Sequence, residues 1–135
     1  MKLVEYAIYE KIKNLVSGKV YAMRAPDGET DDFIVFQRTD SQRWRSINSP
    51  SGIAQAFIRI DSYSQSYYRA KENALLVEGI LDGFAGIVGY GGNSPQDTVN
   101  IGGISLQNDV DLFDQTDEPF LYRSSLSFLV TYEQE

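Results

Sequence analysis

The chain has 135 residues, the size of one ordinary domain, and its 42% hydrophobic and 23% charged residues are typical of a soluble globular protein. It contains no cysteine and no histidine, which excludes thiolate nucleophiles, imidazole bases, disulfides and the usual zinc and haem ligands. The net charge of −7 disfavours a protein that binds nucleic acid over its whole surface. The composition predicts one domain over residues 1–135 and argues against an enzyme.

The N-terminal segment predicts an amphipathic helix that ends at Gly18. Its apolar residues recur at intervals of three and four, and they are Val4, Ile8, Ile12, Leu15 and Val16. Residues 20–23 predict a short strand, which leads into a turn at residues 25–28 because proline and Asp-Gly favour turn geometry. No long apolar run occurs in the chain, so we expect neither a targeting segment nor a membrane contact.

The middle of the chain predicts three extended segments. Residues 33–38 are β-branched and aromatic and predict a central strand. Residues 40–51 are polar and predict a long hairpin arm with a loop near its far end. Residues 54–63 alternate, which predicts a strand with one apolar face; that face carries Ala56, Ile58 and Ile60, and the other carries Phe57, Arg59, Asp61 and Tyr63.

A second helix is predicted from a cap at Ser64 or Ser66 to about Asp82. Its expected buried stripe consists of Tyr67, Ala70, Ala74, Val77 and Leu81, widened by Leu75, Leu76 and Ile80. The glycine-rich residues 86–95 predict a flexible connector.

Two further strands are predicted at residues 98–106 and 121–132, joined by an acidic loop. The element order is therefore helix, three strands, helix, two strands. This order predicts an α+β fold with one mostly antiparallel sheet of about five strands and two helices packed on one face.

The acidic segment contains Asp109, Asp111, Asp114, Asp117 and Glu118. Oxygen ligands at such spacing could hold Ca²⁺ or Mg²⁺. The segment lacks the glycine and closing glutamate of an EF-hand, so we favour a solvated loop and expect no metal. The glycines likewise match no phosphate-binding loop, and no cofactor is expected.

The predicted hairpin arm carries a basic and aromatic cluster of Arg43, Trp44 and Arg45, with Arg38 upstream. Guanidinium groups beside an indole can hold phosphates or stack on bases, but contact with a protein partner and a plain exposed hairpin are both more common. Asp61 lies beside Arg59 on one strand face. A buried or interfacial salt bridge is the favoured interpretation there, ahead of a catalytic carboxylate.

Charge is distributed unevenly along the chain. The net charge is +3 over residues 1–71 and −10 over residues 72–135. Such a division suits a protein with one acidic face and one neutral or mildly basic face, packed in a fixed orientation against its neighbours. A simple solvated acidic surface is the alternative.

The order of these segments resembles the tail terminator, or tail completion, proteins of long-tailed bacteriophages. The matching segments are Val20-Tyr21, Arg24-Ala25-Pro26, residues 33–38, Ser51-Gly52, residues 57–63, residues 81–84 with Gly86, residues 108–113 and residues 121–128. They cover nearly the whole chain, and their order is more specific than any one of them. The enlarged connector at residues 90–97 departs from the family pattern.

The resemblance implies a structural protein of the virion tail or neck, assembled in the host cytoplasm. Family members form a homo-oligomeric ring, usually a hexamer, which caps the tail tube, ends its growth and provides the surface for the head connector. DNA only passes through the pore, and the family has no catalytic residues to transfer. A head-tail joining adaptor of the neck is the close alternative, and a metal-dependent α+β ligand-binding domain is the distant one.

Two groups of residues are the candidates for these roles. We expect contacts with neighbouring copies or with the tube from Arg38, Arg43, Trp44, Arg45, Arg59 and Asp61. We expect an acidic pore or end face from Asp109, Asp111, Asp114, Asp117 and Glu118, because like charge keeps DNA from adhering during its passage.

Overall fold

Two helices, a 3₁₀ turn and six strands follow one another in a computed structural model that describes residues 4–26, 28, 31–45, 50–90, 97–115 and 121–133. The elements are α1 (Val4–Ile12), η1 (Leu15–Gly18), β1 (Val20–Ala22), β2 (Phe33–Arg45), β3 (Pro50–Ser64), α2 (Tyr67–Leu81), β4 (Gly86–Tyr90), β5 (Asp97–Gln115) and β6 (Leu121–Glu133). None of the described helices is long and apolar enough to cross a membrane.

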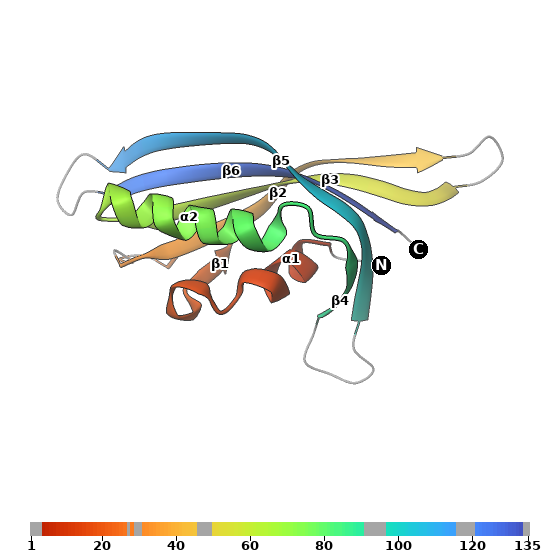
Figure 1. Ribbon diagram of the computed structural model, residues 1–135, viewed down its shortest axis with the longest axis horizontal. Coiled ribbons are helices and arrows are strands. Elements are labelled where there is room, and N and C mark those ends of the chain that lie inside the picture. Colours follow the sequence, from red (N-terminus) through yellow and green to blue (C-terminus); the bar gives the residue numbers. More distant parts are fainter. Residues whose placement is uncertain are drawn as a thin grey trace.

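All six strands form one sheet in the order β1-β2-β3-β6-β5-β4. β1 is parallel to β2, and the other pairs are antiparallel. Both helices cover the same face of the sheet, and the β2–β3 hairpin extends past them (Figure 1). The predicted α+β class, the mostly antiparallel sheet and the hairpin arm are confirmed, although the sheet has one strand more than expected.

The core lies between the helices and the sheet. From the helices it takes Val4, Ala7, Ile8, Ile12, Ala74, Val77 and Leu81. β3 contributes alternate residues from Ala54 to Ile60, and β6 does so from Leu126 to Tyr132. This period of two, which the sequence predicted for both strands, points every second side chain toward the helices.

The first helix is shorter than the apolar spacing predicted. α1 ends at Ile12, and Leu15 and Val16 belong to η1 instead. Val16 and Ser17 have φ values of 46° and 57°, in the left-handed region that side chains rarely adopt. The chain therefore reverses there, while Leu15 and Val16 still pack against the core.

Two segments predicted as loops are strands. The first part of the predicted connector forms β4, in which Ile87 is 71% exposed and Val88 is 7% exposed, the alternation of a strand. β5 continues to Gln115, so Asp109, Asp111 and Asp114 lie on a strand and not in an acidic loop. The remaining connector residues, 91–96, lie outside the described residues.

The predicted stripe of α2 is correct at its centre and wrong at its sides. Ser66 caps the helix, and its hydroxyl accepts a hydrogen bond from the Arg69 N–H. Tyr67, Leu75 and Leu76 are exposed, because the residues that face the sheet are Ala70, Ala74, Val77 and Leu81.

Candidate functional site

The described residues contain no group of three or more carboxylates that could hold a metal ion. The features that stand out are instead two incompletely covered sheet edges and three clusters of charged side chains.

The outer edge of β2 is covered only at its start. β1 pairs with residues 34–36 of β2, and the Met23 N–H then donates to the Phe36 carbonyl at 2.9 Å. No other described strand lies beside residues 37–45 on this side. We call residues 37–45 the β2 open edge.

The opposite edge of the sheet is built in the same way. β4 pairs only with residues 97–101 of β5. Past it, the Gly83 N–H donates to the Ile104 carbonyl at 2.8 Å, and the Leu106 N–H donates to Asp82 Oδ1 at 3.0 Å. Residues 107–115 have no described strand beside them on the side away from β6, and we call them the β5 open edge.

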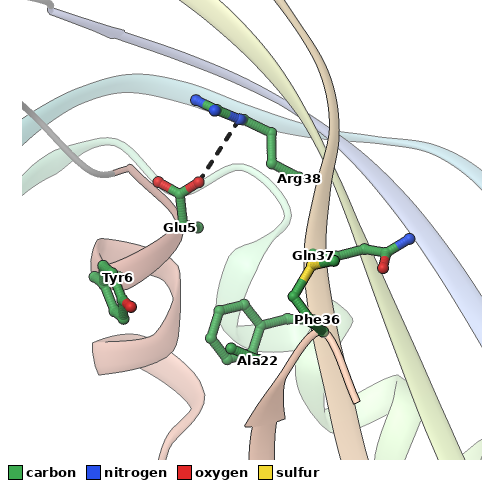
Figure 2. Close-up of a pocket in the computed structure, with 7 residues that line it drawn as sticks. Glu5, Tyr6, Ala22, Phe36, Gln37 and Arg38 are labelled. Carbon is green, nitrogen blue, oxygen red and sulfur yellow. Dashed lines mark ion pairs between the residues drawn. The ribbon is translucent and has the colours of Figure 1, made fainter.

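A cavity of about 450 Å³ lies where β1 ends and the β2 open edge begins. Figure 2 shows Glu5 and Tyr6 of α1 on one side of it and Phe36, Gln37 and Arg38 of β2 on the other. Arg38 Nε lies 3.6 Å from Glu5 Oε2, and the Arg38 side chain is 40% exposed. The other carboxylate oxygen of Glu5 is buried without a hydrogen-bond partner among the described residues.

The face of the sheet opposite the helices carries a charged cluster at its centre. Asp61 is 3% exposed, and its Oδ2 lies 3.2 Å from Arg59 Nε and 3.9 Å from Arg123 Nη1. The salt bridge that the sequence favoured for Arg59 and Asp61 is therefore present. The sequence did not indicate Arg123, because the pairing of β3 with β6, which brings it near, joins segments far apart in the chain.

Asp111 of the acidic segment binds side chains of its own chain. It accepts hydrogen bonds from the Tyr67 hydroxyl (2.7 Å), Lys71 Nζ (3.1 Å) and the Ser124 hydroxyl (3.2 Å). The Tyr67 hydrogen bond, helped by Lys71 and Ser124, lowers the pKa of Asp111 below its usual value. Asp109, two residues earlier on the same strand, is exposed.

A third cluster surrounds Asp32, which the sequence did not single out. Burial alone would raise the pKa of Asp32, but hydrogen bonds from Ser64 (2.7 Å), Arg69 (2.7 Å) and Asn73 (3.3 Å) outweigh burial and lower it. These contacts fix the start of α2 to the segment before β2. The sequence suggested Ser64 only as a possible cap of the second helix and did not indicate these contacts.

Several predicted site residues have no described side chain. Arg43, Trp44 and Arg45 are residues of β2, and Asp114 is a residue of β5. Only the backbone is described at these four positions. Asp117 and Glu118 lie outside the described residues. The structure does establish a division of charge: the bases of the arm belong to β2 and Asp109, Asp111 and Asp114 belong to β5, each the second strand from its end of the sheet.

Comparison with known proteins supports the resemblance found in the sequence. A family model described as tail completion protein gp17 matches residues 9–133. A solved structure described as the virion of a native gene transfer agent particle contains a chain of similar fold, with a TM-score of 0.66 and 15% sequence identity. The match covers 93% of this chain and 91% of that one. A comparison with curated proteins finds no match.

Proposed function

This chain belongs to the tail completion protein family and is a structural protein of a phage virion, and from that premise we propose that it closes the tail tube as a ring of identical copies. The ring caps the end of the tube, stops its growth and presents the surface that joins the head. A ring of six copies is the number that the resemblance implies. One chain of 15.2 kDa is too small to surround DNA, so a channel requires several copies.

The observation that supports a ring is the pair of open edges on opposite sides of one sheet. An unpaired strand edge is a template for another strand. Two different edges on one molecule favour head-to-tail contacts, and such contacts produce rings when the rotation between copies closes. The opposite charge of β2 and β5, which carry the two open edges, adds orientation to this contact.

Four of the six candidate contact residues keep their proposed role within this ring. Arg38 and the arm residues Arg43, Trp44 and Arg45 contact a neighbouring copy or the tube, whereas Asp61 is 3% exposed and pairs with Arg59 of its own chain. The acidic segment at residues 109–118 lies near the channel or an end face, where those of its carboxylates that are not paired with a cation repel the phosphates of passing DNA. The whole chain acts as one domain, and its proposed partners are itself, the tube protein and a neck protein.

The test combines light scattering with electron microscopy. We expect the purified chain, alone or with tail tubes, to form particles whose mass is six times 15.2 kDa and to be seen at one end of each tube. Phage particles that lack the chain should have overlong tails. Tails of normal length without the chain would contradict the proposal, and filled heads beside normal free tails would identify a joining adaptor instead.

A further inference from the structure

We propose that neighbouring copies are joined by their sheets: the β2 open edge of one copy pairs antiparallel with the β5 open edge of the next, with Arg43 opposite Asp109. This inference rests on the proposed ring and specifies how the ring is held together. The partner is therefore a second copy of this chain, bound through backbone hydrogen bonds and a charge pair.

The extent of the two open edges is the first argument. Residues 37–45 and residues 107–115 are equally long stretches of strand, each with a register shift near either end, and β1 and β4 cover only the other ends of their neighbours. A long strand edge left exposed promotes aggregation, and proteins usually shorten, twist or cover it. Pairing these two edges would cover both at once.

Strand direction is the second argument. β2, β3, β6 and β5 are joined by successive antiparallel pairs, so β2 and β5 run in opposite directions. Successive copies in a ring differ only by a rotation, so the sheet can continue from β5 of one copy to β2 of the next as an antiparallel pair. The helices of every copy then lie on the same side of the ring wall, since they share one face of the sheet (Figure 1).

Charge sets the register. When the two open edges overlap fully, Arg43 lies opposite Asp109, between the register shifts that occur near the ends of each edge. Arg43 pairs with Ala54 within its own sheet, and Asp109 pairs with Leu126. Residues opposite one another in a ladder share a face, and Ala54 and Leu126 both belong to the core, so the Arg43 and Asp109 positions lie on the same face.

The geometry of a closed wall agrees with this register. Across the sheet, Arg43 pairs with Ala54, which pairs with Tyr132 of β6, whereas Asp109 pairs with Leu126 of β6. Each copy is therefore displaced along the strands by the distance from residue 126 to residue 132, about 20 Å at the usual rise. Four strand spacings separate equivalent strands, or about 19 Å. The resulting strand tilt of about 45° is that of closed β-barrels, which require such a stagger.

The end of the contact next to β1 offers apolar surface. The cavity beside Arg38 opens there, and Met23 at its rim is 68% exposed. In the proposed register the end of the neighbouring β5, near Gln115, reaches this rim and would cover Met23. The Arg38 side chain is 40% exposed and lies 3.6 Å from Glu5, so it can approach a carboxylate of the next copy while it stays beside Glu5.

Cysteine cross-linking tests the contact directly, because the chain has no cysteine of its own. The double variant Arg43→Cys with Asp109→Cys places the two thiols at opposite edges of one copy, so a disulfide can form only between copies. Oxidation of assembled rings should give a ladder of covalent oligomers up to the full ring. Each single variant and the offset pair Thr39→Cys with Asp109→Cys should give none, because a disulfide requires Cα atoms within about 7 Å.

A charge exchange provides the second readout. Arg43→Asp should reduce the ring fraction at least tenfold at fixed concentration, and so should Asp109→Arg, while the two together should restore it. Rings that form without a ladder from the 43/109 pair, or with a ladder from the offset pair, would overturn this inference and leave the proposed ring intact. A chain that stays monomeric even with tail tubes would overturn the ring itself and this contact with it.

Discussion

The hydroxyl of Tyr67, in the first turn of α2, donates a 2.7 Å hydrogen bond to the carboxylate of Asp111 on β5. Lys71, one turn later, reaches the same carboxylate at 3.1 Å. This relationship ties the start of the second helix to the far end of the longest strand. It also distinguishes Asp111 from Asp109: both are exposed, but Asp111 accepts hydrogen bonds from three side chains of its own chain.

Asp111→Ala should lower the free energy of unfolding by about 1–2 kcal/mol, since three donors lose their acceptor. Tyr67→Phe, which removes one of the three hydrogen bonds, should lower stability by less than Asp111→Ala does. Urea unfolding at a concentration that keeps the chain monomeric measures both. Glu72→Ala, on the exposed side of α2, is the control and should change stability by less than about 0.5 kcal/mol. An Asp111→Ala effect no larger than that of the control would contradict the structural role.

Stability should fall on the acid side of neutrality because of Asp32 and Asp111. Hydrogen bonds outweigh burial at Asp32, and the Tyr67 hydrogen bond leads at Asp111, so the pKa of each is lower in the folded chain than in the unfolded one. Their contribution is complete above the ordinary carboxyl pKa of about 3.9 and is lost as the pH falls through the lower folded value.

The measurement is the thermal midpoint between pH 2 and pH 6. Asp32→Asn should be less stable at neutral pH and should lose less stability on acidification than the unmodified chain. Lys71 has a raised pKa from its hydrogen bond to Asp111, so it contributes stability below about pH 10 that is lost at higher pH. An acid limb that Asp32→Asn leaves unchanged would show that Asp32 has no part in it.

The sequence was sufficient for the parts of the fold that depend on local periodicity. The alternation of β3 and β6 and the small residues at the centre of the α2 stripe were predicted as they are found. These patterns follow from burial of one face, and they can be recognised without knowing which strand pairs with which.

The errors lie where a local pattern is ambiguous or a distant partner decides. Asp109, Val110, Asp111 and Leu112 alternate as a strand does, but their charge indicated a loop. Only pairing with β6 shows that the segment is extended. In β4 two apolar residues among glycines were too short a signal, and the neighbouring β5 stabilises the strand. For the same reason, the sequence could propose Arg59 with Asp61 but could not add Arg123.

Phe128 and Leu75 provide a matched comparison of a core residue with a surface residue. Phe128 is 0% exposed on β6, and Leu75 is 62% exposed on α2. Phe128→Ala should cost about 3–5 kcal/mol because it leaves a cavity in the core, whereas Leu75→Ala should cost less than about 0.5 kcal/mol. Denaturant unfolding of the monomer measures both. A large loss for Leu75→Ala would show that this side of α2 is covered.

The contribution of the charged cluster on the face of the sheet opposite the helices can be tested at Asp61. Its carboxylate is almost fully buried between two guanidinium groups, and its Oδ1 has no hydrogen-bond partner among the described residues. Asp61→Ala would leave Arg59 and Arg123 close to each other without an intervening negative charge. Breaking a buried pair costs about 3–5 kcal/mol. Because both arginines are partly exposed, we expect Asp61→Ala to lower stability by less than that, about 2–3 kcal/mol. Arg59→Ala should cost less than about 1 kcal/mol, because Arg123 still balances the carboxylate. The double variant should lose less than the sum of the two, because removing Arg59 relieves the repulsion. Unfolding of all three variants by urea gives the coupling, and an Asp61→Ala variant as stable as the unmodified chain would mean that the cluster does not stabilise the monomer.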